Sequence, residues 1–205
     1  RGIRDKNHHI EIGALVTWSE AIGSHLPEWF NGVRLAGQQL GGQQIQNRAT
    51  LVGNLCNASA AADGIVALMA LNASVRLQRK NNTRELKLEQ FILANGSTEC
   101  RSDELVTAII IPKPKSFATT TTNSTFIKLG SRCYLVISIV MVGLTISRDE
   151  NNHISQATIV VGACSPVAQR LNALEQRLVG LSLNQAIKQC HDNYHDDCFN
   201  LLQPI

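Results

Sequence analysis

The stretch QQIQNRATLVGNLCNASAAAD, residues 43 to 63, is the starting point for predicting the fold. Its composition is more typical of a ligand-binding segment than of a hydrophobic core. Hydrogen-bonding side chains lie among glycine and alanine with no long apolar run between them: Gln43, Gln44, Gln46, Asn47, Thr50, Asn54, Asn57, Ser59 and Asp63. Small residues around Gly53 would let a bulky polar ligand approach the backbone N–H groups. We therefore expect a ligand-binding loop, with a polar surface loop leading into a capped helix as the alternative.

The next run, ASAAADGIVALMAL, predicts a helix over residues 58 to 71. Asn57 or Ser59 would cap this helix, and its N-terminal end would face the polar loop. Unpaired amides and the positive end of the helix dipole would then lie where an anion could bind.

Composition limits the classes of function. With 205 residues, of which 44% are hydrophobic, the chain can bury a sizeable core in one or two domains. The net charge is only +3, the basic residues are scattered and aromatic residues make up 4%, which argues against a nucleic-acid groove.

No stretch resembles a signal peptide or a membrane span. The longest apolar run, residues 134 to 146, is too short to cross a bilayer and is interpreted as a buried strand. Six cysteines occur without a C-x-x-C pair, which favours reduced thiols and a cytoplasmic location.

Local patterns predict the elements of the first half. Alternation over residues 10 to 15 indicates a strand, Thr17 and Glu20 form a capping box that should start a helix, and Pro27 suits the first turn of a helix over residues 27 to 40. Period-two spacing on both sides of Asn81 and Asn82 predicts a β-hairpin, and residues 104 to 111 form a β-rich run.

A proline pair and a Thr/Ser-rich segment predict a linker over residues 114 to 124, between domains at 1 to 113 and 125 to 205. The second domain should contain a long strand ending at Ile146, a strand over residues 154 to 163, and helices over 167 to 178 and 183 to 193. Strands followed by helices indicate a small α+β domain.

The order Q-I-x-N-x-x-T-x-x-G-N-x-x-N, which begins at Gln44 and is followed by Asp63, resembles the second flavin-contacting segment of the FAD-binding medium subunit of molybdenum hydroxylases. This is the family of xanthine dehydrogenase. The resemblance implies an α+β fold: a partial FAD-binding domain of the vanillyl-alcohol-oxidase type, followed by a C-terminal domain of the carbon monoxide dehydrogenase flavoprotein type. The family's first Gly-rich motif, A-G-G-[ST], is absent, so we expect the chain to lack the first subdomain.

The resemblance also implies a set of cofactor-binding residues. Thr50, Gly53 and Asn54 match the T-x-G-G-N turn that lies against the FAD pyrophosphate in the family, and Asn57 and Asp63 match polar positions downstream.

Two further positions match family contacts to the flavin ring. Lys128 corresponds to a lysine beside the isoalloxazine, where a cation stabilises the anionic reduced flavin, and Val106 to an apolar contact. A solvated strand lysine and an ordinary strand valine are the alternatives. Val52 replaces the first glycine of the turn, which should make it less permissive, and Gln46 replaces a usual arginine.

The implied function is electron transfer in a xanthine dehydrogenase-like oxidoreductase. Electrons from a molybdopterin subunit would pass through two 2Fe–2S clusters of a small partner subunit to FAD here, and then to NAD or another acceptor. A flavin-free assembly subunit and, less favoured, a flavin oxidase acting alone are the alternatives. Cys190, His191, His195 and Cys198 have helical spacing that could suit zinc, but acidic neighbours argue against it, and we predict no metal site and no catalytic residue.

Overall fold

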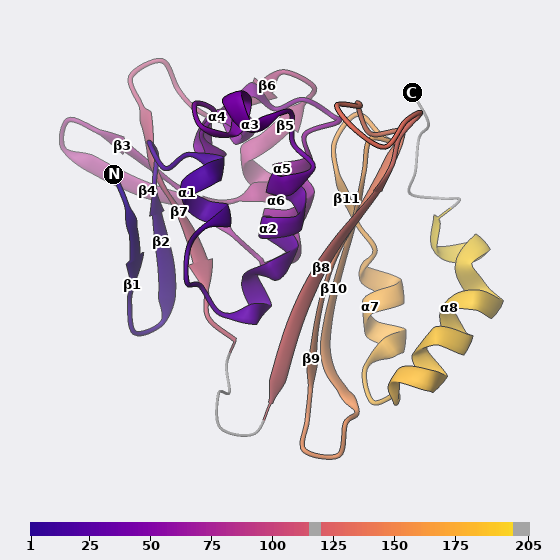
Figure 1. The fold of residues 1–205 in the computed structure, drawn as a ribbon. Helices are drawn as coiled ribbons and strands as arrows, with labels where there is room; N and C mark the ends of the chain where they lie inside the picture. The colour runs from indigo at the N-terminus through magenta and orange to yellow at the C-terminus, as the bar shows by residue number, and fades with distance from the viewer. Residues whose placement is uncertain (115–119, 199–205) are drawn as a thin grey trace.

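Alternating layers of sheet and helix make up the molecule. The computed structural model describes residues 1–114 and 120–198, with side chains to residue 192. A first sheet, a layer of helices, a second sheet and a final pair of helices follow one another across the molecule (Figure 1). This arrangement agrees with the predicted α+β class.

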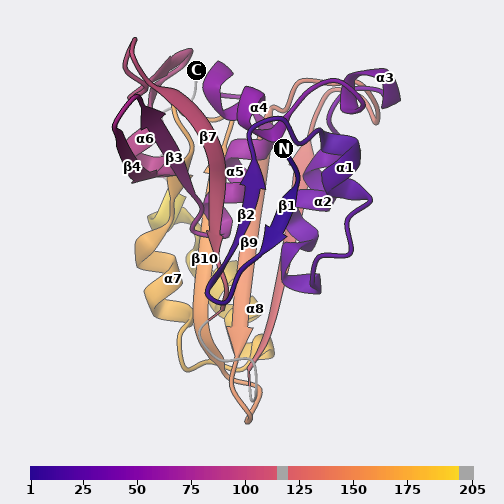
Figure 2. The same ribbon diagram turned by 90° about the vertical axis from the view of Figure 1, so that its left-hand side faces the viewer.

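The first sheet has the order β1-β2-β7-β3-β4, and all its neighbouring strands are antiparallel. Figure 2 shows β1 and β2 at one side of this sheet. The hairpin predicted around Asn81 and Asn82 is confirmed. The strands are β1 (Ile3–Asp5), β2 (His9–Gly13), β3 (Ser74–Arg79), β4 (Asn82–Lys87) and β7 (Leu105–Pro112).

Helices α1, α2 and α5 form the layer between the two sheets (Figure 1). The predicted capping box is confirmed at α1 (Trp18–Ile22), where Thr17 accepts from the Glu20 amide and the Glu20 carboxylate accepts from the Thr17 amide. The helix expected over residues 27 to 40 is divided into a 3-10 turn (Glu28–Phe30) and α2 (Asn31–Gln38).

The helix predicted over residues 58 to 71 differs in the structure. The polar stretch itself forms two short helices, α3 (Gln43–Gln46) and α4 (Leu51–Asn57), and α5 spans Asp63–Ala70. Ala58 ends α4 in the left-handed region with φ of 48°, so the chain turns before α5 can begin. A short helix α6 (Leu88–Phe91) and the two-stranded sheet of β5 (Ile92–Ala94) and β6 (Ser97–Thr98) follow the hairpin.

The second sheet has the order β11-β10-β9-β8 and is antiparallel throughout. Its strands are β8 (Thr121–Leu129), β9 (Val140–Arg148), β10 (Ile154–Gly162) and β11 (Gln169–Arg170). Two expectations need correction. Residues 121–124 of the predicted linker belong to β8, and residues 115–119 lie outside the described part of the chain. The apolar run from 134 to 146 forms a strand only from Val140 onward, and most residues of that strand are half-buried rather than buried; Tyr134 and Ile137 are exposed in the preceding loop.

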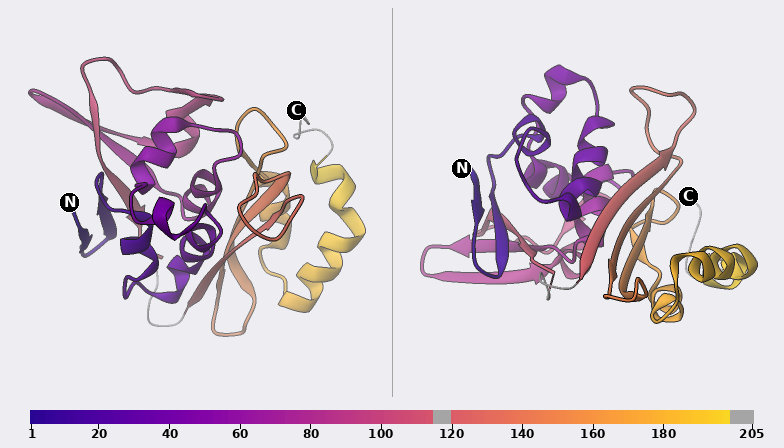
Figure 3. Two further views of the ribbon diagram at one scale, coloured as in Figure 1. Left: turned by 45° about the horizontal axis from the view of Figure 1, so that its top comes forward. Right: turned by 60° about the horizontal axis from the view of Figure 1, so that its bottom comes forward.

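The final layer contains α7 (Asn172–Leu178) and α8 (Leu183–Cys198), seen beyond the second sheet in Figure 3. The helix predicted from 167 begins five residues later, because Gln169 and Arg170 pair with β10. Ser182 bonds the Gln185 amide oxygen at the start of α8. The side chains of His195 and Cys198, which belong to the proposed zinc pattern, lie outside the described residues.

One hydrophobic cluster connects both halves of the chain. It contains Ile12 and Ile109 of the first sheet, Leu68 of α5, and Phe126 and Val160 of the second sheet, all nearly inaccessible to solvent. A smaller cluster lies between the second sheet and α7. Within the described residues, no helix is long and apolar enough to span a membrane.

Candidate functional site

Three of the predicted cofactor-binding residues lie around one cavity. Asn54 of α4, Asp63 of α5 and Lys128 of β8 line a space of about 230 Å³ together with Ser59 and the chain at Gln39. These residues come from both halves of the chain, so the cavity exists only because the second sheet packs against the helical layer. The resemblance had grouped these residues, and the fold brings them together.

A buried ion pair between Asp63 and Lys128 lines this cavity. Lys128 Nζ lies 2.8 Å from Asp63 Oδ2, and the other carboxylate oxygen, Oδ1, accepts a 2.7 Å hydrogen bond from Ser138 Oγ. The side chains of Asp63 and Lys128 are each 7% exposed. Burial of two charges is costly unless the remaining donors and acceptors are satisfied, so the partners of this pair matter.

Those partners are all from the protein. Besides Asp63, the Lys128 ammonium donates to the carbonyl oxygens of Gln39 at 3.2 Å and Val136 at 3.3 Å. An ammonium group has three N–H donors, so the contacts to these three acceptors account for all of them. Lys128 therefore joins β8 to α5 and to the end of α2, and its charge is compensated by Asp63.

The expected glycine-rich turn is the first turn of α4. Thr50 is its N-cap, and Thr50 Oγ1 accepts a 2.9 Å hydrogen bond from the Gly53 amide. The Leu51 amide bonds the Val16 carbonyl, so the protein itself satisfies two of the free amides. Gly53 is exposed, and its φ lies outside the left-handed region. Because a helical backbone needs no glycine, Val52 fits here with its side chain buried.

Asn54 carries an unsatisfied acceptor. Its Oδ1 is buried and has no hydrogen-bond partner among the described residues. A Cβ on Gly64 would lie 2.4 Å from this oxygen, so the absence of a side chain at Gly64 leaves the space that Asn54 occupies. A buried acceptor without a donor is rare, and a ligand donor in the cavity would satisfy it.

Four predicted residues do not line this cavity: Thr50 and Gly53, in the first turn of α4 described above, and two that lie elsewhere. Asn57 is the exposed last residue of α4, and Val106 is a half-buried residue of β7 opposite Leu77. Neither is among the described residues that line the cavity.

Sequence reasoning missed Ser138 and the Gln39 carbonyl. Ser138 is buried and orients Asp63, but it lies in the apolar run that was interpreted as a strand. A serine within an apolar run that bonds a carboxylate far along the chain has no local sequence signal. The Gln39 carbonyl belongs to the backbone and leaves no trace in side-chain patterns.

Known proteins resemble this chain in sequence. Residues 1–114 match the family described as the FAD binding domain in molybdopterin dehydrogenase. The nicotinate dehydrogenase FAD-subunit of Eubacterium barkeri is 30% identical over 95% of this chain and 67% of that protein. The putative xanthine dehydrogenase FAD-binding subunit of Escherichia coli K12 is 25% identical over 85% of this chain and 59% of that protein. The chain thus spans about three fifths to two thirds of these relatives.

Solved structures share the fold. Carbon monoxide dehydrogenase from Oligotropha carboxidovorans aligns over 100% of this chain and 68% of that chain, with a TM-score of 0.88 and 21% identity. Quinoline 2-oxidoreductase from Pseudomonas putida 86 aligns over 98% of this chain and 67% of that chain, with a TM-score of 0.84 and 18% identity. The fold prediction is confirmed, and by its match over more than half of its residues the chain belongs to the family of FAD-binding domains in molybdopterin dehydrogenases.

Proposed function

We propose that this chain is part of the FAD subunit of a molybdenum hydroxylase and passes electrons from iron–sulfur clusters of a partner subunit, through FAD, to NAD or another acceptor. A molybdopterin-binding large subunit would supply the electrons. The observation that carries the proposal is the cavity where Asn54, Asp63 and Lys128 meet, in a chain that belongs to an FAD-binding family. When bound, FAD supplies both one-electron and two-electron chemistry, which would connect the one-electron clusters of the partner to a two-electron acceptor such as NAD.

The polar groups of the cavity fit part of such a cofactor. A space of about 230 Å³ is smaller than the pockets that enclose a drug-sized ligand, so it would hold one portion of FAD. The unsatisfied Asn54 oxygen would accept from a cofactor N–H or O–H group. Thr50, at the start of α4, does not line this cavity, but its hydroxyl accepts from the Gly53 amide and would keep its own proton to donate to a neighbouring part of the cofactor.

The remaining assigned residues have supporting roles in this proposal. Gly53 and Asn57 would contact the cofactor from the exposed face of α4, and Val106 would contact the flavin ring from β7. Asp63 and Lys128 would hold the cavity open between the helices and the second sheet, and present a compensated charge pair to the ring. The substrate could be nicotinate, a purine or another molecule, because the hydroxylation pocket would belong to the partner subunit.

Flavin content of the purified full-length protein tests the proposal. We expect Asn54→Leu to weaken FAD binding about tenfold, which corresponds to the loss of one hydrogen bond and some steric fit. Asn81→Leu, at the exposed hairpin turn, is the matched control and should bind FAD like the unmodified protein. Equal FAD affinity in both variants would remove Asn54 from the site.

A second function, a flavin-free assembly subunit, is favoured by one observation: protein acceptors already take up the hydrogen-bond donors of Lys128. The two functions differ in a simple measurement. Yellow full-length protein with stoichiometric FAD supports electron transfer, whereas colourless protein that co-purifies with larger subunits supports assembly.

A further inference from the structure

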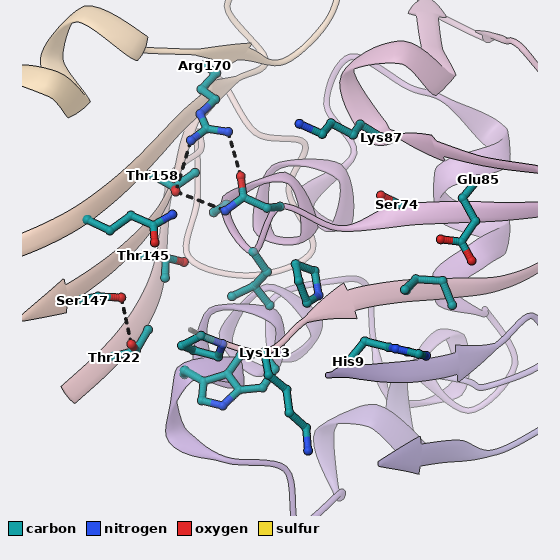
Figure 4. A pocket seen from close by; sticks show the side chains of 18 residues that line it. His9, Ser74, Glu85, Lys87, Lys113, Thr122, Thr145, Ser147, Thr158 and Arg170 are labelled. Carbon is teal, nitrogen blue, oxygen red and sulfur yellow. Dashed lines mark hydrogen bonds between the residues drawn. The ribbon is translucent and has the colours of Figure 1, made fainter. Parts of the chain in front are cut away.

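A larger cavity lies between the two sheets, away from the residues assigned to FAD. It has a volume of about 630 Å³, within the range of small-molecule sites, and residues from both halves of the chain line it. Figure 4 shows its walls: Lys87 and Ser74 project from the first sheet, and Thr145, Thr158 and Arg170 from the second.

One end of the cavity is cationic. The Lys87 ammonium points across the cavity toward the Arg170 guanidinium (Figure 4). Arg170 is compensated, because Nε bonds both oxygens of Glu175 and Nη1 bonds Asn72 Oδ1 at 2.7 Å. Lys87 has no ion-pair partner among the described residues, so its charge is available to a ligand.

Hydroxyl groups line the wall that the second sheet forms. Thr122 and Ser147 bond each other at 2.8 Å across β8 and β9, and Thr158 lies next to Arg170. Thr145 is different, because its buried Oγ1 has no hydrogen-bond partner in the described part of the chain. Its hydroxyl can both donate to and accept from a ligand oxygen.

An unsatisfied indole adds a second donor. Trp29 lines the same cavity, is only 4% exposed, and its Nε1 finds no acceptor within residues 1–114 and 120–192. A buried N–H group without a partner is unfavourable, and an oxygen-rich ligand would supply the missing acceptor. Thr145 and Trp29 therefore both line this cavity, and each has a buried polar atom without a hydrogen-bond partner among the described residues.

We propose that this cavity binds a small molecule that carries one anionic group and several hydroxyl groups, such as a sugar phosphate. Lys87 would hold the anionic group, and Thr145 and Trp29 would bond ligand oxygens. This site is separate from the proposed FAD site, since none of these three residues lines the smaller cavity.

Calorimetric titration of the full-length protein with ribose 5-phosphate, ribose and inorganic phosphate tests this inference. We expect saturable binding of ribose 5-phosphate, and at least tenfold weaker binding of each fragment. Thr145→Val, which keeps side-chain shape, should weaken ribose 5-phosphate binding about tenfold, and Lys87→Met at least as much. The controls are Thr121→Val, on the opposite face of β8, and Lys80→Met, at the hairpin turn.

The outcomes separate the alternatives. Absence of saturable binding at about 10 mM ribose 5-phosphate would mean that the cavity holds only water, and the inference fails. Phosphate that binds as tightly as ribose 5-phosphate, with no effect of Thr145→Val, would reduce the site to an adventitious ion at Lys87 and also overturns it. FAD content measured in the same variants should remain unchanged, so failure here is distinguishable from failure of the FAD proposal.

Discussion

Asp63 serves two parts of the structure at once. As the first residue of α5 it places a carboxylate at the positive end of that helix, where negative charge is favourable. The same carboxylate accepts from Lys128 near the end of β8 and from Ser138 in the loop between β8 and β9. The anion expected at this helix end is therefore supplied by the protein, so a cofactor phosphate would have to bind elsewhere.

Removal of Lys128 should show how strongly this pair is coupled. We expect Lys128→Met to destabilise the protein by about 3–5 kcal/mol, because Asp63 would keep a buried charge without its cation. Adding Asp63→Asn should recover at least about 1 kcal/mol of that loss in a double-mutant cycle measured by urea unfolding. Lys80→Met, at an exposed turn, is the control. Strictly additive effects would contradict the coupling.

Glu104 provides a pH-dependent contribution to stability. Its carboxylate accepts two 2.8 Å hydrogen bonds from Arg84, one from Nε and one from Nη2, and a third from the Arg101 amide. The bonds from Arg84 lower the pKa of Glu104 from 4.5 to about 2. Because the pKa is lower in the folded state, this contribution is present above the unfolded value and is lost as pH falls from about 4.5 to about 2.

Arg84→Met should therefore matter most near neutral pH. We expect its melting temperature to fall by about 4 °C near pH 7, and the difference from the unmodified protein to shrink as pH falls from about 5 to about 2. Arg79→Met breaks the exposed pair with Asp103 and should change stability by less than about 1 kcal/mol. A pH-independent loss in Arg84→Met would show that the pair acts through packing alone.

Residue identity could be predicted from a motif, but side-chain partners could not. Asn54, Asp63 and Lys128 stood out because they match a family pattern, and the structure brings them together. Lys128 also donates to the carbonyl oxygens of Gln39 and Val136. These contacts depend on how distant parts of the backbone pack together, which no local sequence pattern describes. The sequence pattern therefore grouped three residues that line one cavity and left their charge balance undetermined, and their contact with FAD stays a prediction.

At the scale of elements, glycines set how closely α5 approaches the second sheet. A Cβ added at Gly143 of β9 would lie 2.8 Å from the Val66 carbonyl oxygen, and one added at Gly162 of β10 would lie 2.5 Å from Val66 Cγ2. The first clash is with backbone and cannot be relieved by a rotamer change. All eight residues of α5 are buried, so the helix has no free side toward which it could move.

Gly143→Ala should therefore be costly for a single methyl group. We expect a loss of about 1–3 kcal/mol in the free energy of unfolding, measured by urea titration, because the sheet and α5 must separate. Gly23→Ala is the matched control: the φ of Gly23 is −79°, and the new Cβ would meet its nearest neighbour, the Ser19 carbonyl oxygen, at an ordinary contact distance of 3.4 Å. Equal stability of the two variants would mean that the interface accommodates the methyl group.

Element prediction succeeded where the signal is local. The capping box at Thr17 and the hairpin at Asn81 depend on residues within a few positions, and both are confirmed. The division between α4 and α5 was missed because alanine favours helix, yet Ala58 has a left-handed conformation and is buried. The extra strand β11 was missed because pairing with β10 outweighs the helical pattern from 167.

At the scale of the whole molecule, one hydrophobic core joins the two halves that the sequence predicts as separate domains. Phe126, Met141 and Val160 of the second half belong to the same hydrophobic cluster as Trp18 and Leu68 of the first. Separating the halves would expose α5, whose residues are almost all apolar. We therefore expect the two halves to unfold together.

The position of the tryptophans makes this testable. Both tryptophans, Trp18 and Trp29, lie in the first half, so their fluorescence follows the surroundings of that half, including the cavity that Trp29 shares with the second sheet, whereas far-UV circular dichroism follows both halves. Leu174→Ala creates a cavity in the smaller cluster beneath α7 and should cost about 2–5 kcal/mol. If the molecule unfolds as one unit, this variant lowers the urea midpoints of fluorescence and dichroism equally. If the fluorescence midpoint stays unchanged while the dichroism midpoint falls, each half folds independently. The cavity lined by Asp63 and Lys128 would then depend on the association of two domains rather than on a single core.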